Sequence, residues 1–277
     1  MRVGFIGTGS MGSILLESFI ASGALHPNQI VASNRTREKA LRLTREYSGL
    51  TAAANNIQVV RESDVVFICV KPLEFKNVID GVLPYIKPNH LFISITSPIL
   101  LADLEKQLPC SVAKVIPSIT NSVQAGASLM MFGERCSDEE RQLLKELFSK
   151  ISMPLEIDES NTRVSSDIVS CGPAFMSYLL QRFISAAVEE TGISREQATF
   201  LASHMIIGLA ELISKGPFDL ETLQQRVVVP GGVTGAGLQA LENIGDIFNQ
   251  VFRNTQRKYE TDLEEVAHMF YDTRKLD

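Results

Sequence analysis

The chain has 277 residues, which at roughly 150 residues per domain predicts about two domains. Hydrophobic residues make up 45% and charged residues 21%, a globular balance that argues against a disordered, collagen-like or coiled-coil chain. The net charge is −6, and neither half carries the large basic excess that binding of duplex nucleic acid usually needs, so nucleic acid is not expected as a partner.

The distribution of apolar residues and cysteines indicates the cellular compartment in which the protein is expected. The longest strongly apolar run, Val65–Val70, has six residues, far short of the roughly 20 that span a bilayer. The chain begins directly with a strand-like segment, without the apolar stretch of a secretory signal. The cysteines are scattered, as is typical of reduced cytosolic thiols: Cys69, Cys110, Cys136 and Cys171. We therefore expect a cytoplasmic protein without a membrane partner, and the isolated histidines predict no metal site.

Residues 1–159 alternate short apolar runs with amphipathic stretches. The expected strands are Val3–Ile6, Ile30–Ser33, Val65–Val70, Leu91–Ile95, Ala113–Ile116, Ser128–Phe132 and Met153–Ile157. Helical stretches are expected at Gly12–Ser22, in a polar segment through Thr44 and at Asp138–Ile151. Alternation of this kind predicts an α/β fold, a Rossmann-type doubly wound parallel sheet.

Residues 160–277 show helical spacing instead, and we place the domain boundary near Ser160. Pro173 fits the first turn of a helix, and a second helix is expected to end at Lys215-Gly216-Pro217. After Pro230 a further helix runs to about Glu242, and a last one from about Asp246 to Tyr259. The sequence thus predicts an all-helical second domain, whose apolar stripes are buried either within one bundle or in a dimer.

A glycine-rich sequence follows the first strand and opens the first helix. It has the pattern Gly-x-Gly-x-x-Gly, with the residues Gly7, Thr8, Gly9, Ser10, Met11 and Gly12. In this setting the glycines permit a tight turn, close approach of a pyrophosphate and close packing of helix on strand. The helix N-terminus then offers amide donors to the phosphates. The pattern predicts a dinucleotide site.

The end of the second strand indicates which dinucleotide is bound. An NAD enzyme usually carries an acidic residue here, whereas this chain has Ser33, Asn34, Arg35 and Thr36. Hydroxyl, amide and guanidinium groups suit a 2′-phosphate, so we predict NADP(H). The alternative is that Arg35 is a solvated loop residue.

The whole pattern resembles the pyrroline-5-carboxylate reductase family over nearly the whole chain. The resemblance rests on Gly4–Gly12, on Ser33–Thr36, on Val70-Lys71-Pro72, on Ser170–Phe175 and on Val229–Thr234. The last of these is similar to the family's Ser-Pro-Gly-Gly-x-Thr signature. The family reduces a cyclic imine to proline with NAD(P)H, so the resemblance implies an imino acid substrate and a homodimer, or an assembly of dimers, built on the helical domain.

The resemblance also assigns site residues. It implies that the cofactor contacts Asn56, Val70, Lys71 and Pro72 besides the glycine loop and residues 33–36. It implies substrate contacts from the following residues: Ser118, Cys171, Val229, Gly231, Gly232 and Thr234. Thr234 is the candidate catalytic residue, binding the substrate carboxylate or assisting protonation at nitrogen; the alternative is a helix-capping hydroxyl.

The chain departs from the family mainly around the substrate. Ser118 stands where the family commonly has asparagine, and Val229 replaces the first serine of its signature. The family's Ala-Ala-Gly is replaced by Thr96-Ser97-Pro98, and Gly235 stands where isoleucine is frequent. In these departures the chain resembles the divergent, ComER-like branch of the family.

Three functions remain open. The first is an NAD(P)H-dependent reductase acting on 1-pyrroline-5-carboxylate or a close cyclic imino acid. The second is a reductase-like protein that binds NADP(H) and has a regulatory or developmental role with little turnover. The third is another reductase on the same domain pair. A hydroxyacid dehydrogenase is disfavoured because the stretch Gly172–Arg182 lacks the lysine that such enzymes place there.

Overall fold

The structure, a computed structural model, describes residues 1–271, except for the side chain of residue 243. Its contacts divide the chain into two compact units. The first contains Met1–Pro173 and the chain from Arg253 on, and the second contains Ala174–Phe252. The boundary therefore differs from the expected one at residue 160, and the last six residues of the expected second domain lie outside the described residues.

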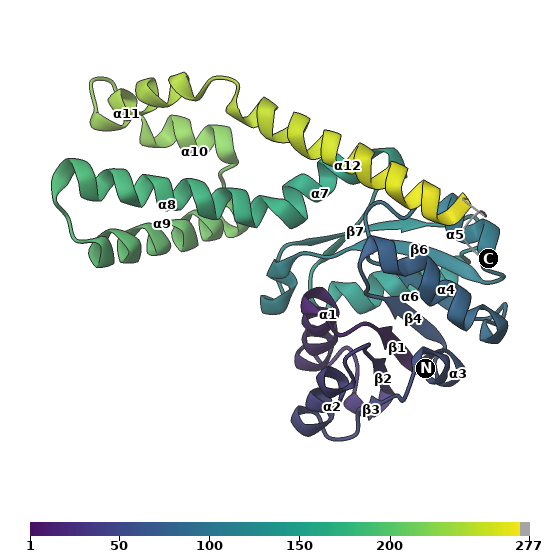
Figure 1. The fold of residues 1–277 in the computed structure, drawn as a ribbon. Coiled ribbons are helices and arrows are strands. Elements are labelled where there is room, and N and C mark those ends of the chain that lie inside the picture. The colour runs from purple at the N-terminus through teal and green to yellow at the C-terminus, as the bar shows by residue number, and fades with distance from the viewer. Residues whose placement is uncertain (272–277) are drawn as a thin grey trace. The chain divides into compact units, whose positions relative to one another are not determined.

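The first unit is built on an eight-stranded sheet with the order β3-β2-β1-β4-β5-β6-β7-β8 (Figure 1). Its strands are β1 (Val3–Ile6), β2 (Ile30–Ser33), β3 (Thr51–Ala52), β4 (Val65–Ile68), β5 (Leu91–Ser94), β6 (Ser111–Ile116), β7 (Ala127–Phe132) and β8 (Met153–Glu156). Neighbouring strands are parallel except for β6 and β7. The expected α/β class with a Rossmann-type sheet is confirmed.

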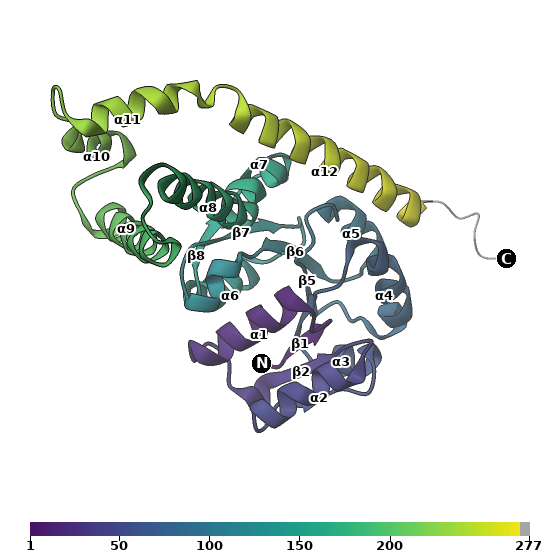
Figure 2. The ribbon, with the colours of Figure 1, turned by 60° about the vertical axis from the view of Figure 1, so that its left-hand side comes forward.

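Helices cover both faces of this sheet (Figure 2). One face packs against α1 (Ser10–Ala21), α2 (Arg37–Glu46) and α6 (Asp138–Ser149). The other packs against α3 (Asn56–Glu62), α4 (Phe75–Val82), α5 (Leu101–Gln107) and the end of α12 (Ile247–Tyr271). The strands are buried on both faces, which explains why β1, β4 and β5 are apolar nearly throughout.

The direction of β7 was not expected from the sequence. The connection from β6 covers residues 117–126 and contains only a 3-10 segment, η4 (Ile119–Val123). A parallel crossover needs a dozen or more residues, usually with a helix, so this connection returns the chain antiparallel. Gln124 and Gly126, with φ of 56° and 75°, make the reversal. The next strand, β8, is again parallel to its neighbour β7, because the helix α6 connects the two strands.

The last helix is longer than expected and explains the division into units. α12 extends beyond the expected end at Tyr259 to Tyr271. Val266 and Phe270 are 2% and 7% exposed and belong to the core of the first unit. The apolar side chains near the C-terminal end of α12 thus return the chain to the sheet that its N-terminal half formed.

Pro173 lies near the start of α8 (Gly172–Thr191), but the helical run begins earlier than expected. It starts with α7 (Thr162–Ser166) and continues through a π-helical turn, η6 (Asp167–Cys171). A proline in a helix lacks an N–H and its ring clashes with the carbonyl four residues before. The π turn widens the helix at the place where that clash would arise.

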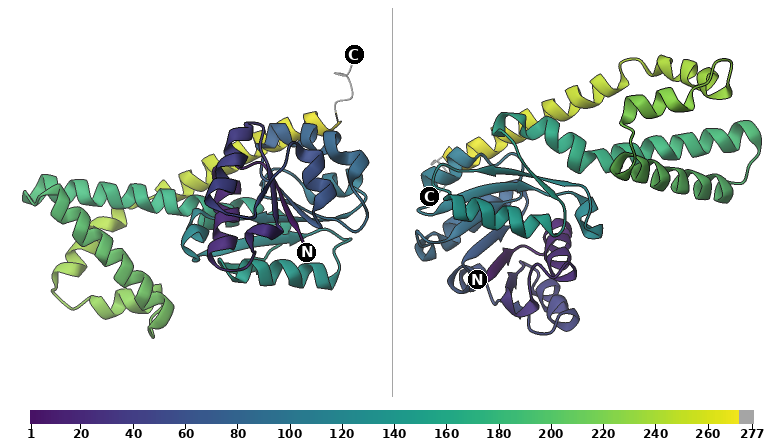
Figure 3. Two further views of the ribbon diagram at one scale, coloured as in Figure 1. Left: turned by 90° about the horizontal axis from the view of Figure 1, so that it is seen from below. Right: turned by 180° about the vertical axis from the view of Figure 1, so that it is seen from behind.

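The second unit is helical, as expected. It holds most of α8, α9 (Arg195–Lys215), α10 (Leu220–Val227) and α11 (Val233–Leu241), and α8 and α9 form an antiparallel hairpin (Figure 3). Its buried apolar cluster contains Ile184, Ala198 and Ala202. Many large apolar side chains of the hairpin are exposed: Met176, Tyr178, Leu179, Phe183, Phe200, Leu201, Met205, Ile206, Ile207, Leu212 and Ile213. Exposed apolar surface of this extent marks an interaction surface.

One helix of the described residues, α9, is long and apolar enough to cross a bilayer by length and composition. Core and interface helices of globular proteins pass the same test. Polar side chains also lie along α9, among them Glu196, Ser203 and Glu211.

We predict that His90 makes the fold sensitive to mild acid. The ring is 4% exposed, and its Nδ1 accepts a hydrogen bond from the backbone N–H of Lys87 at 3.1 Å. Burial, with nearby Lys87, lowers the pKa of His90 below its usual 6.5. The unfolded chain therefore binds a proton that the folded chain rejects, so this stability is present above about pH 6.5 and is lost as the pH falls through the folded pKa.

Urea unfolding between pH 7.5 and 5 tests this. His90→Gln should flatten the decline of the unfolding free energy, and the exposed His26→Gln should leave it in place. An identical decline in the wild type and in His90→Gln would refute the role of His90.

Candidate functional site

The glycine loop has the geometry that a bound dinucleotide requires. Gly7 has a φ of +100°, and a Cβ there would lie 2.5 Å from the backbone oxygen of Cys69. A Cβ on Gly12 would lie 2.2 Å from the carbonyl oxygen of Gly7, whereas one on Gly9 would meet nothing within 4 Å. Gly7 and Gly12 therefore serve the close packing of β1, α1 and β4. Gly9 has open space beside it and directly precedes the N-terminus of α1, which begins at Ser10, an arrangement that suits a phosphate group.

The end of β2 is tied to this loop by hydrogen bonds. The amide oxygen of Asn34 accepts from the backbone N–H of Thr8 at 3.0 Å, and its amide nitrogen donates to the carbonyl of Thr36. Ser33, which is 2% exposed, donates to Asn56 at 2.7 Å. Five of the predicted cofactor positions are thus held by hydrogen bonds to one another: Thr8, Ser33, Asn34, Thr36 and Asn56.

Most of the predicted cofactor residues surround one cavity of about 660 Å³ at the carboxyl ends of the strands. It is lined by these predicted positions: Gly7, Gly9, Ser33, Asn34, Arg35, Thr36, Asn56, Val70 and Lys71. We call it the dinucleotide cavity. The guanidinium of Arg35 is 85% exposed and pairs with Glu74, another lining residue. In parallel α/β sheets ligands bind in this crevice.

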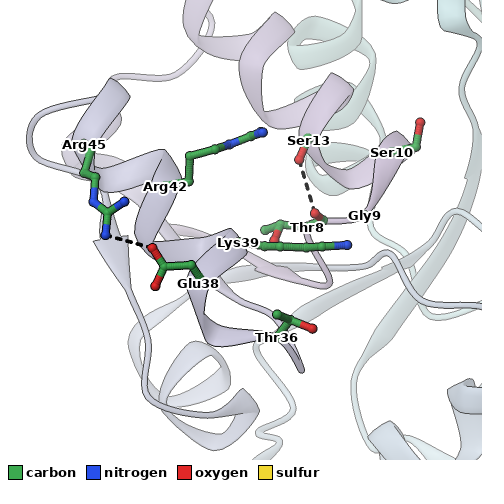
Figure 4. A pocket seen from close by; sticks show the side chains of 9 residues that line it. All are labelled: Thr8, Gly9, Ser10, Ser13, Thr36, Glu38, Lys39, Arg42 and Arg45. Atoms are coloured by element: carbon green, nitrogen blue, oxygen red, sulfur yellow. Dashed lines mark hydrogen bonds and ion pairs between the residues drawn. The ribbon is translucent and has the colours of Figure 1, made fainter.

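Sequence reasoning missed Lys39, which lines both the dinucleotide cavity and a neighbouring hollow between α1 and α2 (Figure 4). The hollow also contains Thr8, Ser10, Ser13 and the cations Arg42 and Arg45. Those two arginines pair with glutamates, Arg45 with Glu38 at 2.8 Å. The available signal was a lysine in the first turn of the helix after β2, next to the expected phosphate.

A second cavity of about 470 Å³ adjoins the first, and we call it the acceptor pocket. The two share Gly9, Cys69, Val70 and Lys71. The acceptor pocket further contains these residues: Ser10, Met11, Pro72, Ile95, Thr96, Ser97, Pro98, Ile116, Pro117, Arg163, Ser166, Ser170 and Cys171. The predicted cofactor residues Ser10, Met11 and Pro72 and the predicted substrate residue Cys171 therefore lie here.

Cys171 lies in this pocket as a thiol. Burial raises the pKa of Cys171, and Arg163, whose Nη2 lies 3.5 Å from the sulfur, opposes this in part. A thiol with a raised pKa is a poor nucleophile, so Cys171 is a small packing group of the pocket wall.

Ser118 has a different environment from the one expected. The residue is fully buried, and its hydroxyl donates to the carbonyl of Val169 at 2.8 Å. Val169 is four residues before Pro173, which has no N–H to give that carbonyl. Ser118 thus satisfies a backbone acceptor in the π turn, and its neighbours Ile116 and Pro117 line the pocket instead. The structure argues against the expected substrate contact of this hydroxyl.

The predicted substrate residues of the helical domain form one loop of the second unit. Val229 is exposed, Gly231 has a φ of +71°, and the N–H of Gly232 donates to the carbonyl of Val229 at 3.0 Å. Thr234 lies in the first turn of α11, whose N-cap is Gly232 without a side-chain cap bond. Thr234 is therefore not the capping hydroxyl considered as its alternative. Its catalytic role stays a prediction.

A buried ion pair supports the floor of the acceptor pocket. Lys114 on β6 is fully buried, and its ammonium donates to Glu159 at 2.5 Å and to the carbonyl of Ser97 at 3.2 Å. Glu159 also accepts from the backbone N–H of Leu101 at 3.0 Å. Burial lowers the pKa of Lys114, and Glu159 opposes the shift. The pair fixes the loop after β5 that carries Ser97 and Pro98.

In the described part of the chain, no three His, Cys, Asp or Glu side chains gather where they could hold a metal ion. The four cysteines are free thiols.

Comparison with known proteins gives the family. Residues 159–262 match the family model described as pyrroline-5-carboxylate reductase dimerisation, and residues 2–98 match the one described as NADP oxidoreductase, coenzyme F420-dependent. ComE operon protein 4 of Bacillus subtilis is 47% identical over 98% of this chain and all of the relative. Pyrroline-5-carboxylate reductase 3 of the same organism is 30% identical over 96% of this chain and 98% of the relative.

Solved structures show the same fold. The pyrroline carboxylate reductase of Plasmodium falciparum, solved with NADP bound, has a TM-score of 0.81 at 24% identity and covers 98% of both chains. The pyrroline-5-carboxylate reductase of Coxiella burnetii has a TM-score of 0.82 at 23% identity, over 97% of this chain and 98% of that one. Joined to the NADP-type glycine loop and the full-length relatives, this likeness places the chain in the pyrroline-5-carboxylate reductase family, as an NADP-binding oxidoreductase of that type.

Proposed function

We propose that the protein reduces a cyclic imino acid with NADPH, and that 1-pyrroline-5-carboxylate, giving L-proline, is its substrate. The observation that supports this is the acceptor pocket, which adjoins the dinucleotide cavity along Gly9, Cys69, Val70 and Lys71. A small molecule in the pocket would lie beside the end of the dinucleotide, which is the arrangement that hydride transfer needs.

The residues of the first unit fit NADP(H). The space at Gly9 and the amides that begin α1 suit the pyrophosphate. The hydroxyl of Thr8 is buried and has no hydrogen-bond partner in the described chain, as expected for a group whose partner is a bound ligand. Ser33, Asn34, Arg35 and Thr36, with Lys39, would hold the ribose and its 2′-phosphate. Asn56, Val70, Lys71 and Pro72 would line the remaining length of the cofactor.

When bound, NADPH supplies the hydride, so the protein needs to position the acceptor and exclude water. The residues of the acceptor pocket would hold the imine against the cofactor. In the second unit, Thr234 and the backbone amides of Gly231 and Gly232 would bind the carboxylate or assist protonation at nitrogen. Val229 offers no hydroxyl for that task, so affinity for the substrate should be modest.

We predict that Arg35→Ala weakens NADPH binding and leaves NADH binding nearly unchanged. A charge-assisted contact contributes roughly 1.5–3 kcal/mol, which is about 10- to 150-fold in affinity. Fluorescence titration with both cofactors measures this. Arg37→Ala, which removes an exposed cation outside the lining of the dinucleotide cavity, is the matched control. Equal losses of NADPH and NADH in Arg35→Ala would contradict a contact with the 2′-phosphate.

The decisive test of the function is NADPH oxidation with 1-pyrroline-5-carboxylate and, in parallel, with piperideine-6-carboxylate. We expect turnover with one or both. NADPH binding of ordinary affinity without turnover of either imine would reject the proposal.

That negative outcome would favour a second function: an NADP(H)-binding protein with a regulatory or developmental role of the competence or sporulation type. One observation favours it specifically. A relative 47% identical carries the name ComE operon protein 4, which states no reaction.

We further propose that the protein is a cytoplasmic homodimer, or an assembly of dimers, formed through the second unit. The exposed apolar side chains of α8 and α9 lie within the match to the dimerisation model. Light scattering of dilute protein should give at least twice the monomer mass of 30.5 kDa. Replacing Phe183 and Phe200, which are 64% and 63% exposed, with Ser should shift the mass toward the monomer. A wild-type mass near that of one chain would refute the dimer.

A further inference from the structure

The wall of the acceptor pocket carries buried polar atoms that have no partner in the described chain. These are the hydroxyl oxygens of Ser97 and Ser166 and the Nε of Arg163. Ser166 is 2% exposed and the Arg163 side chain 17% exposed. Buried donors without a partner cost free energy, so three of them on one pocket point to a ligand that satisfies them.

The orientation of the Arg163 side chain is fixed by residues that do not line the acceptor pocket. Its Nη2 pairs with Asp167 at 2.6 Å, and Asp167, which is 2% exposed, also accepts from the hydroxyl of Thr255 at 2.6 Å. The guanidinium carbon lies 5.8 Å from the centre of the Tyr259 ring. One corner of the guanidinium is thus anchored by Asp167 and contacts the Cys171 sulfur, while the Nε has no partner among the described residues. A guanidinium held in this way presents N–H donors of fixed direction.

The charges around the pocket have one sign. Its lining contains two cationic side chains, Lys71 and Arg163, and no acidic one among the described residues. Asp167, the counter-charge of Arg163, lies behind the guanidinium and outside the lining. Cations with converging hydroxyl donors are complementary to a small anion, and a planar guanidinium suits a carboxylate.

We propose that Arg163, Ser166 and Ser97 form a carboxylate subsite in the acceptor pocket. The inference rests on the proposed function in that the carboxylate belongs to the molecule being reduced. It goes beyond that function because it assigns a carboxylate contact to side chains of the first unit. The carboxylate is either the single one of a monocarboxylic imino acid or the second one of a dicarboxylic imino acid.

Binding to the NADP⁺-loaded protein tests the subsite without requiring turnover. Calorimetric titrations would use three stable probes: L-proline, L-prolinamide and cis-pyrrolidine-2,5-dicarboxylate. The wild type should bind at least one acid more tightly than the uncharged amide. If the subsite holds the single carboxylate of a monocarboxylic acid, replacing the subsite residues should weaken the binding of L-proline. If it holds the second carboxylate of a dicarboxylic acid, the same replacements should weaken the binding of cis-pyrrolidine-2,5-dicarboxylate alone.

The variants are chosen so that the fold survives. Removing Arg163 alone would leave Asp167 buried and uncompensated, so the main variant is the double replacement Arg163→Met with Asp167→Asn. We expect it to weaken the responsive acid roughly ten-fold or more, and Ser166→Ala to weaken it about two- to ten-fold. L-prolinamide should be unaffected in both. Lys215→Met with Glu211→Gln, which removes an exposed ion pair outside the pocket and also keeps the net charge, is the matched control.

Thermal unfolding and NADPH affinity establish that each variant is folded. Unchanged affinity for both acids in a folded double variant, or an equal loss for the acids and the amide, would overturn the subsite and leave Arg163 a structural partner of Asp167. A wild type that prefers no acid over the amide would overturn it as well. Carboxylate binding that depends on Arg163 in a protein without imine turnover would support the subsite while rejecting the reductase function.

Discussion

Replacing Glu159 with Ala is expected to lower the free energy of unfolding by about 3–5 kcal/mol, because the buried ammonium of Lys114 loses its ion-paired carboxylate and keeps only the weaker attraction of Asp103. Lys114 is fully buried on β6, and its remaining protein partner is the carbonyl of Ser97 at 3.2 Å. The backbone N–H of Leu101 would also lose its acceptor. Urea unfolding at neutral pH measures the loss.

Two controls separate burial from pairing. Glu38→Ala removes an exposed pair, Arg45 with Glu38, whose side chains are 68% and 64% exposed, so we expect a loss below about 1 kcal/mol. Replacing Lys114 and Glu159 together with Met should be less harmful than Glu159→Ala, because no buried charge is left unpaired. If Glu159→Ala costs no more than Glu38→Ala, water or another group compensates Lys114 and the proposed role of the pair is wrong.

Replacing Gly12 with Val is expected to weaken NADPH binding roughly a hundred-fold or more, because losing two charge-assisted contacts to the pyrophosphate costs about 1.5–3 kcal/mol each. A Cβ at this position would lie 2.2 Å from the carbonyl oxygen of Gly7 and 3.0 Å from the Cβ of Cys69. Neither a backbone carbonyl nor a packed strand end can move aside without moving α1 from the glycine loop. The amides at the start of α1 would then miss the pyrophosphate.

Titration of NADPH into the folded variant measures the effect. Gly81→Ala is the matched control, because Gly81 lies in α4 and a Cβ there meets nothing within 4 Å. That variant should keep NADPH affinity and gain up to about 1 kcal/mol of stability from the better helix propensity of alanine. Wild-type affinity in Gly12→Val would show that the loop does not hold the pyrophosphate.

The parts of the fold that the sequence predicted are those with a local signal. Apolar runs such as Val65–Val70 marked strands buried on both faces, and the glycine spacing marked the turn from β1 into α1. The short β3 and the helix α10 escaped notice. Neither carries a long enough periodic pattern to stand out from a loop.

The candidate site divides in the same way. Asn34 and Arg35 could be predicted as cofactor contacts from their place after β2, because the chemistry that suits a 2′-phosphate follows from residue type, and the structure places both on the dinucleotide cavity. Ser118 could not, because its hydroxyl is taken by the carbonyl of Val169, 51 residues further along the chain. Arg163 was missed because its setting depends on Asp167, Thr255 and Tyr259, which the sequence places far apart.

The sequence by itself determined the α/β class, the helical second half, the dinucleotide loop and the preference for NADP(H), since each follows from backbone sterics, periodicity or residue chemistry within a short segment. Only the tertiary structure decided the reversal of β7, the return of α12 to the sheet, the approach of Lys39 to the dinucleotide cavity and the polar wall at Arg163. These depend on which distant segments pack together. The free energy of packing depends on the whole assembled core, so it cannot be read from the residues next to one position in the sequence.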